Sequence, residues 1–168
     1  IAAGNEGDTG RHVGGELQPQ QSIEFQVSPR EPGLVLQLYA PVLSELSIEV
    51  TNPLGRRTGA IPLVEGYRQV SLDRDLIINY NTGPKPFNLE GEVIISIVSE
   101  LEQSITSGQW IITMVNASSD GGRYDIWMPI SANLQATTRF LNPDVYNTLG
   151  IPATVENVVS VGSYNYNT

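Results

Sequence analysis

The residues with the clearest catalytic chemistry stand near the start of the chain. His12 is the single histidine of the 168 residues, and Asp8 precedes it in a glycine-rich stretch. A Ser-His-Asp triad would have to use His12 as its base. Nothing marks a nucleophile, because the sequence has neither a Gly-x-Ser-x-Gly motif nor a Gly-Thr-Ser before a helix. We therefore interpret His12 as a solvated or hydrogen-bonded surface residue.

Asp8-Thr9-Gly10 has the residue types of an aspartic-protease motif. That chemistry needs two carboxylates that share a proton, normally from two such motifs. The other aspartates have different neighbours, so the second motif is missing from the sequence. The motif therefore does not predict an aspartic protease.

Oxygen ligands suitable for a hard cation fall into two groups along the chain. These are Asp73 with Asp75, and Asn116 with Asp120 and Asp125. Their spacing matches no calcium-loop signature, and Asp and Asn in turns usually bond their own backbone. We predict no metal site and no cofactor, with calcium as the alternative. The sequence has no cysteine, which excludes disulfides, zinc-thiolate sites and a Cys nucleophile.

The chain is acidic, with 18 Asp and Glu against 9 Lys and Arg and a net charge of −9. Phosphate binding needs a basic surface, so we expect no nucleic-acid partner. No apolar stretch approaches the roughly 18 residues that a membrane-spanning helix needs. A hydrophobic content of 40% over this length is typical of one domain with a substantial core.

A period of two in the apolar residues dominates the middle of the chain. After a loop-like stretch at 4–22, short alternating runs are separated by turns rich in Gly and Pro. The runs expected to be strands are 23–27, 34–38, 46–50, 68–72, 75–80, 91–99, 108–116 and 123–131. Around eight such strands without a convincing helix predict a mainly β fold, an antiparallel β-sandwich or jelly roll. The tail differs, because Val158, Val159 and Val161 suit a strand buried on both faces of a parallel sheet.

Two short motifs at the ends carry a family resemblance. "AAGNEG" at 2–7 resembles the oxyanion-hole segment of subtilisin-like serine proteases. In the tail, Thr148-Leu-Gly-Ile-Pro152 and then "VVSVGS" at 158–163 are similar, in the same order, to the T-x-G-x-P turn and following strand of these proteases. The long segment between the two motifs is the difference. It resembles the arrangement in bacterial subtilases with a jelly-roll insertion, including germination-associated proteases of spore-forming clostridia.

The resemblance implies a division of the chain into three parts. Residues 1–20 would be a stub of the protease domain that carries the oxyanion-hole segment, 21–140 the jelly-roll insertion, and 141–168 the return into the protease domain. The fold would then be a β-sandwich flanked by short stubs of a subtilisin-like α/β domain. It also implies a bacterial protein that is secreted, at the cell surface or associated with spores.

The resemblance assigns roles to five residues. Asn5 matches the side-chain donor that stabilises the tetrahedral oxyanion. Ala2, Ala3 and Gly4 would form one wall of the substrate pocket, and Gly150 would lie on its opposite rim. The family's catalytic Ser, His and Asp motifs are absent, so we expect this chain to hydrolyse nothing by itself.

The expected function is that of an insertion within a serine endopeptidase that cleaves peptide bonds. Its partners would be the rest of the protease domain and a protein or peptide substrate, and the sandwich would brace the fold or screen the pocket. The alternative is a carbohydrate- or protein-binding module within an active or inactive protease. Aromatic side chains could supply its surface. They are Trp110, Trp127, Tyr39, Tyr67, Tyr80 and Tyr124. We expect both tryptophans to lie in the core instead, because each stands in an alternating strand.

Overall fold

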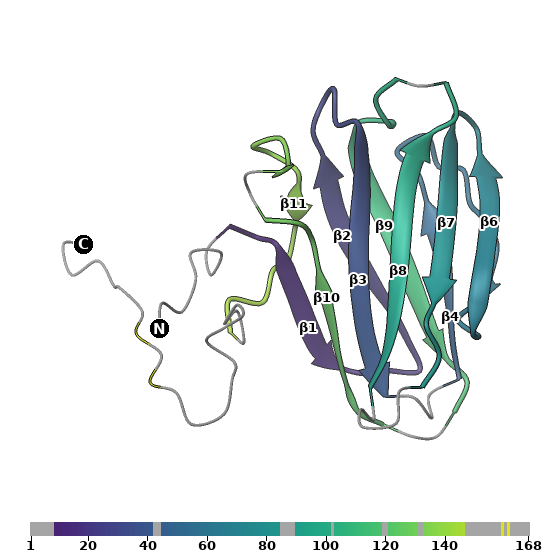
Figure 1. Cartoon of the computed structure of the whole chain (residues 1–168), viewed down its shortest axis with the longest axis vertical. Coiled ribbons are helices and arrows are strands. Elements are labelled where there is room, and N and C mark those ends of the chain that lie inside the picture. The colour runs from purple at the N-terminus through teal and green to yellow at the C-terminus, as the bar shows by residue number, and fades with distance from the viewer. Residues whose placement is uncertain are drawn as a thin grey trace.

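The part of the chain that the structure describes is built from two antiparallel β-sheets (Figure 1). The structure is a computed structural model. It describes residues 9–41, 45–84, 90–101, 103–118, 121–130, 133–146, 159 and 161. The prediction of a mainly β sandwich is confirmed.

The first sheet has six strands in the order β1-β10-β3-β8-β7-β6. The strands are β1 His12–Glu16, β10 Arg123–Trp127, β3 Gly33–Pro41, β8 Glu90–Ser99, β7 Asp75–Asn81 and β6 Gly66–Leu72. Every neighbouring pair in this sheet is antiparallel. This sheet faces the viewer in Figure 1, with β1 and β6 at its two edges.

The second sheet has five strands in the order β11-β2-β9-β4-β5. The strands are β11 Arg139–Phe140, β2 Gln20–Val27, β9 Gly108–Asn116, β4 Leu46–Thr51 and β5 Ile61–Pro62. The long β2–β9 pairing runs from Gln20 opposite Val115 to Val27 opposite Gly108. It forms the centre of this sheet.

The core lies between the sheets and follows directly from the alternation in the sequence. In β2, for example, Ile23, Phe25 and Val27 are buried, and the residues between them face outward. Trp110 is fully buried, and its indole N–H donates to the Thr106 carbonyl at 2.8 Å. Its predicted place in the core is therefore confirmed.

The stretch 4–22 is less loop-like than its glycines suggested. Residues 12–16 form β1, which pairs with β10 from His12 opposite Trp127 to Glu16 opposite Arg123. The start of β2 at Gln20 also lies in this stretch. The loop interpretation was wrong here, because pairing with a strand distant in sequence outweighs the local preference of glycine.

The incoming and outgoing segments of the sandwich run side by side. The Phe140 amide donates to the Gly10 carbonyl, and the Asp144 amide donates to the His12 carbonyl, each at 2.9 Å. Gly10 has a φ of 71°, and a Cβ there would lie 3.2 Å from the Arg139 Cβ, so a glycine suits this crossing. Both segments lie at the β1 side of the first sheet (Figure 1).

The buried strand expected in the tail stays a prediction. Val158 and most of its neighbours lie outside the described residues. Val159 and Val161 are described, and both are exposed.

Candidate functional site

The five residues that the family resemblance singled out lie outside the part of the chain that the structure describes. They are Ala2, Ala3, Gly4, Asn5 and Gly150. Their roles stay predictions. The structure does describe the segments at 10–12 and 140–144, through which the chain enters and leaves the sandwich.

A charged cluster, which we call the junction clasp, ties the incoming and outgoing segments together. It consists of His12, Arg123, Asp125 and Asp144. The His12 Nε2 lies 2.7 Å from Asp125 Oδ1, and His12 Nδ1 lies 3.2 Å from the Asp144 carbonyl. Arg123 Nη2 donates to Asp125 Oδ1 at 2.9 Å and to Asp144 Oδ2 at 3.0 Å. One arginine thus bridges two carboxylates, one of them on the outgoing segment.

His12 is buried, with only 1% of its surface exposed, so the expectation of a surface histidine was wrong. Its ring stacks on Trp127 at a centroid distance of 4.0 Å. Both ring nitrogens face oxygen atoms that only accept hydrogen bonds, a carboxylate and a carbonyl. A histidine held in this way has no free nitrogen with which to act as a general base.

The Asp144 carboxylate and the Arg123 guanidinium stabilise each other's charged forms. Hydrogen bonds to Asp125 and then to Asp144 raise the pKa of Arg123 above its usual value. Burial by itself raises the pKa of Asp144, but the Tyr146 amide and the Arg123 guanidinium donate to its carboxylate and outweigh that effect. The pKa of Asp144 is therefore lowered overall.

Gly14 makes room for the clasp in β1. A Cβ at this position would overlap Asp125 Oδ1 and would lie 2.6 Å from Arg123 Nη2. Gly14 pairs with Asp125 across the sheet, so the carboxylate and the guanidinium lie over the bare glycine backbone. Gly14, the first glycine of a "GG" pair that looks like a loop signal, is thus required by the charged cluster.

A buried carboxylate forms a second anchor for the outgoing segment. Glu31 is 1% exposed and accepts hydrogen bonds from the Gln135 amide, at 3.0 Å, and from the Thr138 hydroxyl. The Ser28 amide donates to Thr138 Oγ1 at 3.0 Å. The turn before β11 is therefore fixed to the end of β2.

The oxygen ligands considered for calcium are engaged in protein contacts. Asp75 is fully buried and accepts from the Thr106 amide, while Asp73 accepts from the Asn52 side chain. Asn116 accepts from Ser118, and Asp125 belongs to the clasp. Asp120 lies outside the described residues. Among the residues that the structure describes, no three His, Asp or Glu gather in a group that could hold a metal ion.

The aromatic residues do not form one continuous binding surface within the described chain. Trp127 was expected in the core but is half-buried on the outer face, where it covers His12. Tyr124 is buried, and Tyr39 donates its hydroxyl to Glu92. Tyr67 and Tyr80 are exposed and stand opposite each other on β6 and β7.

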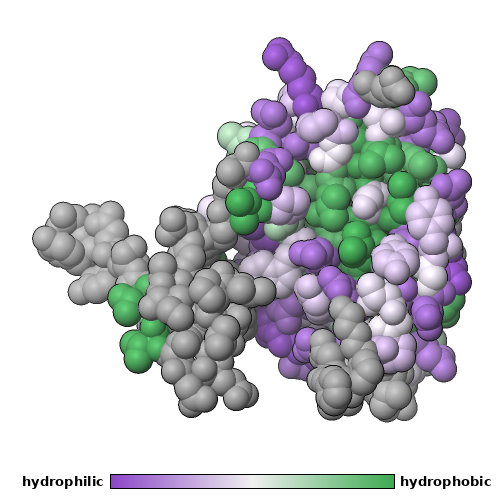
Figure 2. Space-filling view, in the orientation of Figure 1, coloured by the Kyte–Doolittle hydropathy of each residue, from purple (hydrophilic) through white to green (hydrophobic). Residues whose placement is uncertain are grey.

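The outer face of the six-stranded sheet carries an apolar area, which we call the apolar face. It appears as a green patch over β3, β8 and β7 in Figure 2. Cross-strand pairing brings its residues together around Ser96. They are Val35, Leu76, Ile78, Ile94 and Val98. Val35 is 41% exposed and the other four are half-buried.

The outer face of the five-stranded sheet is mostly polar by contrast. Among the described strand residues, Ile111 and Val115 on β9 and Pro62 on β5 interrupt its polar residues. The polar residues are Ser22, Glu24, Gln26, Ser47, Glu49, Thr51 and Thr113. An antiparallel sheet with one solvated face normally alternates in this way, whereas strands apolar on both sides are typical of sheets covered on both faces. The apolar face is therefore the surface of the sandwich best suited to be covered.

Comparison with known proteins finds similarity among solved structures. No family model matches the sequence, and no curated protein matches it. Among solved structures, the CspB protease of Clostridium perfringens matches 98% of this chain with a TM-score of 0.92 and 46% sequence identity. This match supports a subtilase-related domain. The chain spans 34% of the length of that protease chain. The described residues contain no helix long and apolar enough to cross a membrane.

Proposed function

We propose that this chain is the jelly-roll insertion, with flanking segments, of a subtilisin-like serine endopeptidase. The observation that carries the proposal is the match to the CspB protease over nearly the whole chain at 46% identity. Unrelated proteins also adopt the sandwich architecture, so a shared fold alone would be weak support. A sequence identity of 46% over that fold is stronger support for a relationship. The two terminal motifs add support, because they resemble subtilase segments in the order that an insertion requires.

The geometry of the junction also favours an insertion. The incoming segment at Gly10–His12 and the outgoing segment at Phe140–Asp144 are hydrogen-bonded to each other. A domain inserted into a host needs its two connections close together, since both must join neighbouring points of the host. The strand orders, with β1 beside β10 and β2 beside β9, support a jelly-roll description because strands from the two ends of the sequence pair in both sheets.

In the longer protein, Asn5 would act as the oxyanion donor. Its side-chain amide would point at the negative charge that develops on the carbonyl oxygen as a serine attacks the peptide bond. A donor placed for that charge stabilises the transition state more than the substrate, so it accelerates the reaction itself. Ala2, Ala3, Gly4 and Gly150 would leave room for a substrate side chain. The serine, histidine and aspartate would come from the longer protein.

The rest of the protease domain would cover the apolar face. Val35, Ile78 and Ile94 lie on strands whose inward residues already form the core, so a second apolar surface needs a second layer. The matched protease chain contains about twice as much polypeptide outside the region of this match as within it, since the match covers 34% of its length. Burial of this face would let the sandwich brace its host.

A fluorophosphonate probe, which labels activated serines, tests the proposal. We expect a longer protein that restores both flanking regions to be labelled, and the 168-residue chain alone to remain unlabelled. Labelling of this chain by itself would show that it contains a nucleophile and would overturn its description as non-catalytic. A longer protein that resists labelling would contradict an active endopeptidase.

The alternative of a carbohydrate-binding module rests on Tyr67 and Tyr80. They are exposed neighbours on the same face and could stack on a sugar ring. Of the other aromatic residues considered, Trp110 lies in the core and Trp127 covers His12. Binding on a glycan array that is lost in Tyr67→Ala would favour this alternative over an insertion that only braces its host.

A further inference from the structure

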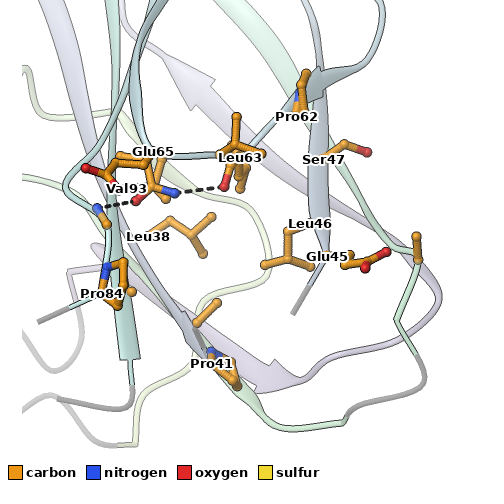
Figure 3. Close-up of a pocket in the computed structure, with 16 residues that line it drawn as sticks. Leu38, Pro41, Glu45, Leu46, Ser47, Pro62, Leu63, Glu65, Pro84 and Val93 are labelled. Carbon is orange, nitrogen blue, oxygen red and sulfur yellow. Dashed lines mark hydrogen bonds between the residues drawn. The ribbon is translucent and has the colours of Figure 1, made fainter. Parts of the chain in front are cut away.

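A pocket of about 570 Å³ opens at one end of the sandwich, where β3 ends and β4 and β8 begin. This is within the size range of small-ligand pockets in proteins. Its floor is apolar, because Leu38, Leu46 and Val93 line it together with the half-buried Leu63. Figure 3 shows Leu38 and Leu46 near the centre of the space, between the ends of the two sheets. The pocket lies apart from the junction clasp, none of whose residues line it.

Two exposed carboxylates stand at the rim of this pocket. Glu45 and Glu65 lie on either side of Leu38 and Leu46 in Figure 3. None of the described residues that line the pocket is Lys, Arg or His, although the Arg68 guanidinium donates to the carbonyl of the lining residue Val64 at 2.8 Å. The whole chain has a net charge of −9, which adds to the negative potential at the rim. The pocket thus combines an apolar floor with an anionic edge.

The wall beside Glu65 is held in place by a short network. Asn81 donates from its side chain to the Leu63 carbonyl at 2.7 Å and accepts from the Gly83 amide at 2.8 Å. Gly83 has a φ of 72°, and a Cβ there would lie 2.9 Å from the carboxyl carbon of Glu65. The Glu65 side chain therefore packs against the bare backbone of Gly83.

We propose that this pocket binds a basic side chain, lysine or arginine, presented by an extended peptide segment of a partner protein. Such a side chain has an apolar stem and a cationic head. The stem would lie along Leu46 and Leu63, and the head would meet Glu45 or Glu65 at the rim. Charge complementarity selects this occupant, because an acidic group would be repelled and a purely aliphatic one would leave both carboxylates unused.

Nuclear magnetic resonance titration of the 168-residue chain tests the proposal. The probes are three peptides, acetyl-Gly-Leu-Arg-Leu-Gly-amide and its versions with Gln or Glu in place of Arg. We expect saturable shifts of the Leu63, Gly91 and Val93 amide signals with the Arg peptide. One exposed ion pair in place of a like-charge repulsion makes its dissociation constant about tenfold lower than that of the Glu peptide. The Gln peptide falls between the two.

Paired variants separate the pocket from general charge effects. Glu45→Gln with Glu65→Gln is expected to remove the preference for the Arg peptide. Glu16→Gln with Glu24→Gln removes the same charge elsewhere on the surface and should preserve that preference. All four substitutions are at exposed or half-exposed sites, and thermal melting verifies that each variant is folded.

Three outcomes would overturn the proposal. They are no saturable shift with the Arg peptide, equal affinity for the three peptides, and equal loss in both paired variants. The proposal does not depend on the protease assignment, since the fluorophosphonate experiment and this titration use different probes and different residues.

Discussion

Each residue of the junction clasp contributes through a partner distant in the sequence. His12 stands on the incoming segment, Arg123 and Asp125 on β10, and Asp144 on the outgoing segment. Removing one member leaves the others with unsatisfied charge in a partly buried place, which costs more than the pair contributes when intact. Single substitutions in the clasp therefore test how the incoming and outgoing segments are held together.

His12→Phe keeps a flat ring against Trp127 but removes both ring nitrogens. The Asp125 carboxylate and the Asp144 carbonyl then lose one partner each. We expect a loss of about 1–3 kcal/mol in the free energy of unfolding, measured by urea denaturation. Tyr67→Phe, at an exposed position, serves as the control and should change stability by less than about 0.5 kcal/mol. A His12→Phe variant as stable as the parent chain would contradict the described role of the clasp.

Asp144→Asn tests the charge of the outgoing segment through pH. The pKa of Asp144 in the folded chain is lowered from the ordinary value of 3.8, so folding favours its charged form. This contribution to stability is present above that ordinary value and is lost as the pH falls through the lower, folded-state pKa. We expect the variant to melt at a lower temperature than the parent chain at pH 7, and the difference to vanish near pH 2. A constant difference across this range would be the contrary result.

At the scale of strands, the alternation of apolar and polar residues predicts most of the strands. It does not predict the two-residue strands or the glycine-containing β1. The eight alternating runs match β2, β3, β4, β6, β7, β8, β9 and β10, to within a few residues at their ends. The two-residue strands β5 and β11 are too short to show a period. β1 was missed because Gly14 and Gly15 favour a loop, and its pairing with β10 depends on a partner far along the chain.

The two neighbouring glycines of β1 provide a matched test at this scale. A Cβ at Gly14 would overlap Asp125, whereas a Cβ at Gly15 would make ordinary contact, 3.5 Å from the Tyr124 ring. We expect Gly14→Ala to lower stability by about 1–3 kcal/mol through overpacking. Gly15→Ala should be neutral or stabilise the chain by up to about 1 kcal/mol, because the unfolded chain loses freedom. Chemical denaturation of both variants compares them, and equal effects would refute the assigned role of Gly14.

The apolar face can be tested by substitutions that keep strand preference. Val35→Thr and Ile78→Thr retain β-branched side chains on the outer face of the first sheet. In the 168-residue chain we expect little change in stability, about 0.5–1 kcal/mol at most. In the longer protein the same pair should lower the melting temperature by several degrees more than in the chain alone. Equal effects in both proteins would mean that no other part of the protein covers this face.

For the molecule as a whole, the sequence predicts the fold class, whereas contacts between distant residues appear only in the structure. The alternating strand pattern predicted a β-sandwich, and two terminal motifs predicted its place in a protease. The clasp was out of reach of sequence reasoning, because His12 meets Asp125 and Asp144 only through the fold. The apolar face follows from strands such as β8, whose apolar residues are almost continuous, but locating it required the sheet order. The oxyanion residues remain predictions, since they lie outside the described chain.

The most direct test of the central claim is the peptidase rate of the longer protein with Asn5→Ala. Loss of one oxyanion-hole donor from a subtilisin lowers kcat about 100- to 1000-fold, and we expect a fall of this size with KM nearly unchanged. Asn142→Ala, at an exposed position of the outgoing segment, is the control and should leave both constants unchanged. An unchanged kcat in Asn5→Ala, or a longer protein with no peptidase activity at all, would contradict the proposed role of this chain.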